Sequence, residues 1–290
     1  MKKFILATDS GCDLPISLCK EKDIHTLFLT YQIDGQVYTD TMEEDKCKEF
    51  YYRVRKGAMP STSQLNPMQY LEFWKKLMPF NLPIVHIALG SEISGTYANG
   101  LTARDMLLEE YPDAKIYVVD STAASTGYGL LAIEAAKLRD ADYTAEQCVE
   151  WLEKNRHNVN TYYTTENLTH LQRGGRISKA SQVIGTALKI NPIMKLSHSG
   201  KMFVSEKVRG SKATKSRIMS LIAGNVVSPE TQTLYIAHAD NIEKAQEYGQ
   251  ALQAELGFKD VFYPYIGSII GSHTGPDLIA IFYLGKPRED

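Results

Sequence analysis

The stretch PIVHIALGSEISGTYANG, residues 83–100, decides the fold class of this 290-residue chain. Its first seven residues are almost wholly apolar, as in a buried strand, and the residues from Gly95 to Glu110 have helical spacing. Ser94 lies where it could cap that helix, and Gly95 allows close approach to its first N–H groups. Such a helix start suits an anion. On this turn alone, an ordinary helix cap is the simpler explanation of Ser94.

The rest of the first half repeats this alternation of strand and helix. Strands are predicted at FILATD (4–9), HTLFLTYQID (25–34), PIVHIAL (83–89) and AKIYVVD (114–120). Helices are predicted at 15–22, 43–55, 95–110 and 127–138, and one begins at Asn66-Pro67 with Asn as its cap. Strands that alternate with helices indicate a parallel sheet with helices on both faces.

The pattern changes after about residue 157. Short strand candidates follow one another, with two amphipathic helices between them near 212–222 and 243–255. We therefore predict two α/β domains, with a parallel sheet in residues 1–157 and a mixed sheet with helices in residues 158–290.

Composition excludes several classes of protein. A net charge of -2, with 43% hydrophobic and 23% charged residues, is typical of a soluble globular protein. Such a charge creates no positive electrostatic field that would attract nucleic acid. No apolar run approaches the roughly 20 residues needed to cross a bilayer, and MKKFILATDS is too short in apolar residues for a signal peptide. The four cysteines have no metal-binding spacing, so we expect free thiols, no metal and a cytoplasmic protein.

The loops that could carry chemistry are rich in hydroxyl groups. TDSGCD (8–13), GSEISGT (90–96) and DSTAAS (120–125) each follow a predicted strand, at the sheet edge where ligands bind, and PSTSQ (60–64) precedes the helix at Pro67. The sequence contains no phosphate loop, no dinucleotide fingerprint and no G-x-S-x-G elbow. We therefore expect no nucleotide site, no cofactor and no catalytic residue. The histidines at 25, 86 and 170 look like strand or surface residues, with His86 packed in the core.

Two loops of the second half add charge. LTHLQRGGRISK (168–179) places Gly174 and Gly175 between Arg173 and Arg176, where the glycines permit unusual backbone angles. GSHTGPD (271–277) suits a hairpin loop, although a hairpin does not explain its histidine. From residue 172 to 217 there are 11 basic residues and 1 acidic residue, a balance of 11 − 1 = +10. A solvated face explains this balance, and so does an acidic protein partner or a membrane surface.

Taken in order, several segments resemble the DegV family over essentially the whole chain: TDSGCDLP, PSTSQ, SEISGTY, VVDSTAASTGYG, HLQRGGRIS, NPIMKLSHSGKM and GSHTGPDLIAIFY. The family is similar to the fatty acid-binding subunits of bacterial fatty acid kinase. The resemblance implies that one long-chain fatty acid lies between two α/β domains. A separate kinase protein would phosphorylate its carboxylate, and the acyl phosphate would pass to an acyltransferase, at or near the membrane surface, for phospholipid synthesis.

The resemblance also implies roles for individual residues. Thr62 and Ser94 would hydrogen-bond the carboxyl head, Gly95 and Thr96 would add backbone N–H groups, and His273 would orient this network. Arg173 and Arg176 would contact the phosphate or the kinase. The candidates for the acyl tunnel are apolar residues near the matched loops, for which ordinary core packing is the better explanation: Ile184, Leu188, Ile193, Met194, Ile266, Ile269 and Ile270.

Three positions depart from the family pattern, namely Glu92, Asn191 and Asp277, and we expect the two acids to point to solvent. One alternative is a serine hydrolase that uses Ser94, His273 and Asp120, although the usual elbow is missing. A second is a DegV-like protein that binds another lipid and has no kinase partner. A nucleic-acid-binding role has no motif to support it.

Overall fold

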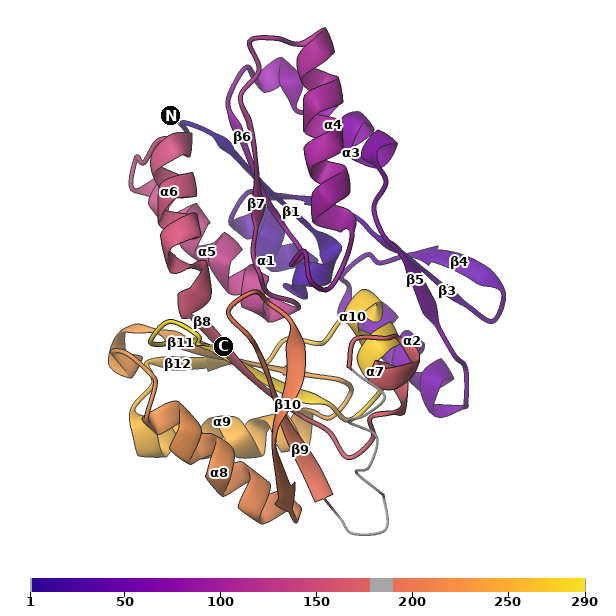
Figure 1. Ribbon diagram of the computed structural model, residues 1–290, viewed down its shortest axis with the longest axis vertical. Helices are drawn as coiled ribbons and strands as arrows, with labels where there is room; N and C mark the ends of the chain where they lie inside the picture. Colours follow the sequence, from indigo (N-terminus) through magenta and orange to yellow (C-terminus); the bar gives the residue numbers. More distant parts are fainter. Residues whose placement is uncertain (1, 178–189, 290) are drawn as a thin grey trace.

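The computed structural model describes residues 2–177 and 190–289 (Figure 1). The first domain is built on a four-stranded parallel sheet in the order β2-β1-β6-β7. The strands are β1 (Ile5–Asp9), β2 (Ile24–Leu27), β6 (Ile84–Ala88) and β7 (Ile116–Asp120). β1 and β6 are buried along their whole length, as expected for central parallel strands with helices on both faces.

Helices cover the two faces of this sheet. α3 (Pro67–Lys75) and α4 (Thr96–Glu110) lie on one side, and α5 (Thr126–Asp140) and α6 (Ala145–Asn155) lie on the other (Figure 1). α1 (Ile16–Glu21) packs on β2. The predicted start of α3 is confirmed, because Asn66 and Gln69 form a reciprocal capping box and Pro67 is the first helical residue.

One predicted strand proved to be two. The segment 25–34 divides near Leu29, so that β2 joins the parallel sheet while β3 (Thr30–Ile33) joins a small antiparallel sheet in the order β4-β3-β5. At the division, the buried Leu29 donates its backbone N–H to Ser10 Oγ at 3.1 Å. β4 (Gln36–Thr39) precedes α2 (Glu44–Arg55), and β5 (Ser61–Ser63) runs through the PSTSQ loop.

The second domain contains a six-stranded mixed sheet in the order β10-β9-β8-β13-β11-β12. Within this sheet, β11 and β12 are the only described strands that pair in parallel. The strands are β8 (Val159–Thr164), β9 (Ile190–Leu196), β10 (Met202–Arg209), β11 (Thr233–His238), β12 (Asp260–Phe262) and β13 (Ile279–Leu284). The predicted domain boundary lies between α6 and β8.

Four helices lie in the described part of this half: α7 (Thr169–Arg173), α8 (Ser211–Ala223), α9 (Ile242–Leu256) and α10 (Ser268–Thr274). The hairpin explanation of residues 271–277 is wrong, because β13 pairs with β11 and β8 rather than with β12. This segment instead forms most of α10, which contacts α2, β3 and β5 of the first domain. Short 3-10 turns complete the fold at Ser10–Cys12, Met78–Phe80, Arg156–Asn158 and Pro229–Thr231.

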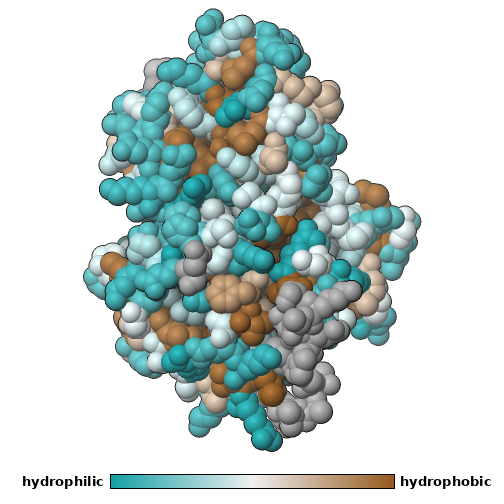
Figure 2. All heavy atoms as spheres, in the orientation of Figure 1, coloured by the Kyte–Doolittle hydropathy of each residue, from teal (hydrophilic) through white to brown (hydrophobic). Residues whose placement is uncertain are grey.

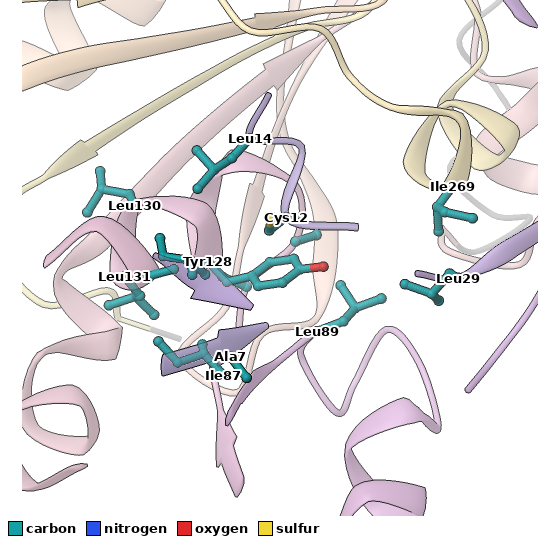
Figure 3. Packing of buried hydrophobic residues seen from close by; sticks show 14 of the residues in the cluster. Ala7, Cys12, Leu14, Leu29, Ile87, Leu89, Tyr128, Leu130, Leu131 and Ile269 are labelled. Atoms are coloured by element: carbon teal, nitrogen blue, oxygen red, sulfur yellow. The ribbon is translucent and has the colours of Figure 1, made fainter. Parts of the chain in front are cut away.

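One hydrophobic core cluster is shared by the two domains, and a second cluster lies within the second domain. α5 contacts β1 and β6 of the first sheet and β8 and β13 of the second, and its Gly127 lets the helix approach the ring of Phe282. Tyr128 of α5 lies among Ala7, Leu14 and Leu89 (Figure 3). Among the described residues, no helix combines the length and the apolar character that a membrane crossing needs.

Two of the three histidines considered in the sequence analysis, His86 and His170, lie in the interior. His86 is buried in β6, where its Nδ1 accepts a hydrogen bond from Trp74 Nε1 at 3.3 Å, and burial lowers its pKa to about 3. His170 is neither a strand nor a surface residue, contrary to expectation. It is buried in α7, where its ring packs so closely on Gly275 that a Cβ there would collide with it.

Candidate functional site

A cavity of about 310 Å³ lies where the two domains meet, close to the lower limit of about 300 Å³ for small-molecule sites. Hydrophobic residues are visible in the hollow between the upper and lower halves of the molecule (Figure 2). One part of the wall is apolar: Leu29, Leu89, Ile93, Ala124, Leu171, Met202, Ile269 and Ile270. The other part is polar: Thr62, Ser63, Gln64, Ser94, Arg176, His273 and Thr274.

The apolar wall is assembled from segments that are far apart in the chain. Leu29 follows β2, Leu89 follows β6, and Ile269 belongs to α10. Their side chains approach one another from these three elements (Figure 3). Such a surface offers an occupant dispersion contacts and removal from water, and no hydrogen bonds.

A hydrogen bond across the domain junction links Thr62 and His273. Thr62 Oγ1 lies 2.7 Å from His273 Nε2, so β5 of the first domain is joined to α10 of the second. Burial, with smaller contributions from Arg176 and Arg173, lowers the pKa of His273 to about 4. The imidazole is therefore neutral at pH 7, with one ring nitrogen as donor and the other as acceptor.

Close packing fixes the position of this imidazole. His273 Nδ1 is buried without a hydrogen-bond partner among the described residues. It faces Gly174, where an added Cβ would lie 2.5 Å from it. Gly174 therefore leaves room for the ring, and its own backbone has ordinary helical angles with φ −70°. The unusual backbone angle expected of this glycine pair occurs only at Gly175, with φ 70°.

The turn before α4 differs from the prediction in one detail. The residue at the cap position is Gly95, and Ser94 does not cap the helix. Ser94 Oγ instead lies 2.9 Å from Thr96 Oγ1 and accepts a hydrogen bond from Thr96 N at 3.3 Å. A Cβ at Gly95 would collide with the side-chain amide of Gln64, which explains the glycine. Ser94 lines the cavity, whereas Thr96 is fully buried behind it.

The two predicted arginines have different surroundings. Arg173 donates to Pro60 O at 2.8 Å and to Ser272 O at 3.3 Å, so it ties the β5 loop to α10. Arg176 lines the cavity and donates to Ile93 O at 3.2 Å and to Gly174 O. Burial lowers the pKa of Arg176. Among the described residues, neither guanidinium forms an ion pair with a carboxylate, so Arg176 brings an unbalanced positive charge to the wall.

The candidates for the acyl tunnel separate into three groups. Ile269 and Ile270 line the cavity. Met194 and Ile266 are fully buried in the shared core, and Ile193 belongs to the second core cluster beside α8 and α9, so these three do not line it. The strand period explains Ile193 and Met194, because neighbours in β9 point to opposite faces. Ile184 and Leu188 lie outside the described residues.

Sequence reasoning missed several residues of the wall. Three of them lie inside or directly beside the hydroxyl-rich loops, namely Gln64, Leu89 and Ala124. Their position next to these loops is the sequence signal that marks them. Leu29 and Met202 stand in ordinary strand-like sequence, with no local feature to mark them. Only the packing of the two domains brings them to one surface.

The TDSGCD loop serves the core rather than the cavity. Asp9 accepts hydrogen bonds from Leu89 N at 3.1 Å and from Tyr128 OH at 2.5 Å, and its pKa is raised to about 6 by burial. It therefore holds the end of β6 against α5. Among the described residues, no group of three or more His, Cys, Asp or Glu side chains is placed to hold a metal ion.

The hydrolase triad is not assembled. The carboxylate of Asp120 accepts hydrogen bonds from Ser91 Oγ at 2.6 Å and from Ser91 N at 3.1 Å. Ser94 is hydrogen-bonded to Thr96, and His273 is hydrogen-bonded to Thr62. No Ser–His–Asp chain of hydrogen bonds connects these residues, as acyl-transfer chemistry requires.

The three departures from the family pattern leave the cavity unaltered. Glu92 is exposed, and Asn191 is buried in β9. Asp277 is half-buried rather than simply exposed, because its oxygens accept hydrogen bonds from Arg55 at 2.8 and 3.0 Å. That ion pair balances the acid, and none of the three residues lines the cavity.

Comparison with known proteins gives consistent matches. The family model described as "Uncharacterised protein, DegV family" matches residues 3–286. A DegV domain-containing protein of Clostridium perfringens is 38% identical over 290 residues, which is 100% of both chains. DegV of Bacillus subtilis, whose structure is described as that of a fatty acid binding protein, is 27% identical with a TM-score of 0.83, over 99% of this chain and 100% of that one. A DegV lipid binding protein of Thermotoga maritima is 26% identical with a TM-score of 0.84, over the same shares.

Proposed function

The chain belongs to the DegV family, and on that premise we propose that it binds one long-chain fatty acid in the cavity between its domains. The observation that carries this proposal is the division of the wall into an apolar part and a polar part with an unbalanced arginine. A fatty acid has the matching division into hydrocarbon and carboxylate. Solved relatives with this fold are described as fatty acid-binding proteins, and their ligand is consistent with the proposal.

The carboxylate occupies the polar wall. Neutral His273 donates from Nε2 to Thr62 Oγ1, which leaves the Thr62 hydroxyl hydrogen free to point at the carboxylate. Ser94 supplies a second hydroxyl, and Arg176 supplies the opposite charge. Gly95 adds its N–H at the start of α4, whose positive end favours an anion, whereas the N–H of Thr96 already binds Ser94 Oγ at 3.3 Å. Arg173 acts indirectly, by joining the loop that carries Thr62 to α10.

The hydrocarbon supplies most of the affinity. Each buried CH₂ contributes about 0.8 kcal/mol, so about a dozen such groups give about 10 kcal/mol before the costs of binding. A hydrogen bond to a charged group contributes about 1.5–3 kcal/mol. The apolar wall therefore sets how tightly the ligand is held, while the polar wall sets which way it points.

This division of labour suits a carrier that presents its carboxylate to another protein. We propose that the partner is a separate kinase, which phosphorylates the bound carboxylate to an acyl phosphate for phospholipid synthesis. The chain itself acts as a binding subunit. Support comes from the resemblance described above and from the unassembled triad of Ser94, His273 and Asp120.

The first experiment identifies the ligand. The purified protein is denatured and extracted, and its lipids are quantified by mass spectrometry, with about one long-chain fatty acid per chain expected. A different lipid at that ratio would favour a DegV-like carrier of another class. No extracted lipid, together with no binding of added oleate, would overturn the proposal.

The second experiment tests the polar wall. Replacing Thr62 and Ser94 together by alanine removes both hydroxyls, and we expect the variant to fold but to support no acyl-phosphate formation by the kinase. Ser91→Ala is the matched control, because this exposed serine belongs to the same turn and does not line the cavity. An unchanged yield from the double variant would rule out the assignment of the head group.

A further inference from the structure

A second cavity, of about 170 Å³, lies on the second domain between β8, β9 and the C-terminal segment. The C-terminus lies beside β8 in Figure 1. The wall of this second cavity includes Asn160, Thr161, Lys195, Asn225, Lys286 and Arg288. Among the described residues, the two cavities share no lining residue. An inference about it therefore stands independently of the fatty-acid proposal.

The charge of this wall is one-sided. Lys195, Lys286 and Arg288 are cationic, and Glu289 is the one acid among the described lining residues. Within residues 2–177 and 190–289, none of the three cations forms an ion pair, whereas five of the ten arginines do. Lys286 Nζ has a single long contact to Gly224 O at 3.4 Å, and Lys195 Nζ lies 5.4 Å from the ring centre of Phe203.

Arg288 makes this imbalance costly. It is only 6% exposed, and its two terminal nitrogens donate to Thr122 O at 3.1 Å and to Thr122 Oγ1 at 2.7 Å. Its Nε is buried and has no partner among the described residues. Burial lowers its pKa to about 10, so the guanidinium remains charged at pH 7. A buried carboxyl can take up a proton, but this group cannot lose its charge and is best stabilised by an anion.

The remaining wall residues narrow the class of anion. Asn225 Oδ1 is also buried without a partner in the described part of the chain, and Thr161 adds a hydroxyl to the wall. Asn225 Oδ1 can only accept a hydrogen bond, so its partner must be a donor. Inorganic phosphate near pH 7 combines negative oxygens for the cations with a hydroxyl that can donate to such an acceptor, and a phosphomonoester has that hydroxyl in its monoanionic form, below a second pKa of about 6. A carboxylate at this pH has no hydroxyl to offer.

We propose that this second cavity binds inorganic phosphate or the phosphate group of a small phosphomonoester. Lys195 of β9 and Lys286 of the C-terminal segment supply charge, and Arg288 supplies the buried guanidinium. The acceptor oxygen of Asn225 distinguishes a phosphate hydroxyl from a carboxylate. The two sources share this chemistry and are separated by the experiment.

Binding is measured by calorimetry on the full chain, with inorganic phosphate, glycerol 3-phosphate and acetate titrated at constant ionic strength. We expect both phosphates to bind and acetate not to bind. Lys195→Gln and Lys286→Gln should each weaken phosphate binding by about tenfold or more, since each removes a charged hydrogen bond. Lys212→Gln is the matched control, because this exposed lysine of α8 belongs to the same basic stretch and lies outside the cavity.

The lysines are chosen because Arg288 also anchors Thr122, so that its replacement could disturb the fold. Tighter binding of glycerol 3-phosphate would identify a phosphomonoester site, and tighter binding of inorganic phosphate would identify a free-phosphate site. No heat of binding from either phosphate would overturn the proposal. So would equal affinity in Lys195→Gln, Lys286→Gln and Lys212→Gln, or equal binding of acetate.

Discussion

Replacing Gly174 by alanine tests the polar wall without removing any group that contacts the ligand. The backbone of Gly174 has φ −70°, which alanine adopts without strain. The added Cβ would lie 2.5 Å from His273 Nδ1 and 3.2 Å from His170 O. Ordinary contact begins at 3.4 Å, so the imidazole must move by about 3.4 − 2.5 = 0.9 Å.

The size of the effect follows from the hydrogen bond that this movement disturbs. Thr62 Oγ1 and His273 Nε2 are 2.7 Å apart, and a neutral hydrogen bond of this kind contributes about 0.5–1.5 kcal/mol to stability. The Thr62 hydroxyl then loses its orientation toward the carboxylate, a charged hydrogen bond that contributes about 1.5–3 kcal/mol. Since 1.4 kcal/mol is tenfold in affinity, we expect fatty-acid binding to weaken by about 10- to 100-fold.

The assay is displacement of a fluorescent fatty acid by oleate, with denaturant unfolding measured on the same samples. Gly224→Ala is the control, because Gly224 also has helical angles and its added Cβ would meet nothing closer than 3.7 Å. We expect this control to bind like the parent protein. If Gly174→Ala also binds like the parent while its imidazole is displaced in a crystal structure, then the Thr62–His273 pair does not orient the ligand.

Three further predictions concern stability, domain contact and chain length. Burial raises the pKa of Asp40 to about 7 from 3.8, so the folded state holds a proton that the unfolded state releases, and stability is lost as pH rises from about 4 to 7. Asp40→Asn should therefore gain stability relative to the parent between pH 5 and pH 8 in urea titrations, and an equal difference at both pH values would contradict this. Arg55→Ala removes partly exposed ion pairs to Asp240 and Asp277 and should lower the free energy of unfolding by about 1 kcal/mol. In a double-mutant cycle, Arg55→Ala and Asp277→Ala should show coupling, and additive effects would contradict this. Leu29→Phe narrows the apolar wall, so competition assays should show a larger loss of affinity for an 18-carbon acid than for a 12-carbon acid, and equal losses would place Leu29 away from the acyl chain.

Local pattern was sufficient for most elements of the fold. β1, β6 and β7 are runs of apolar residues that each end at a polar turn, and the start of α3 has a cap whose hydrogen bonds involve residues only three apart. Such features depend on neighbours in the chain, so a sequence displays them directly. The division of residues 25–34 into β2 and β3 was not visible, because Leu29 is held by Ser10, nineteen residues away.

The same distinction applies to the candidate site. Thr62, Ser94 and His273 were named from motifs in three separate loops, and the structure places all three on one wall. The sequence alone could not decide whether Ser94 caps the helix or contacts a ligand, because both roles use the same hydroxyl at the same turn. The structure places Gly95 at the cap position and Ser94 in the cavity wall, and contact between Ser94 and a ligand stays a prediction.

Sequence by itself determined the class of the fold, the family, and which loops carry hydroxyls and arginines. Only the tertiary structure decided that Ile269 faces the cavity while Ile193 and Ile266 do not, and that Leu29 and Met202 belong to its wall. The physical reason is that an apolar side chain gains the same free energy from burial in a core as from burial against a ligand. Which of the two it meets depends on how α10 and the two sheets pack, and no local pattern encodes that choice.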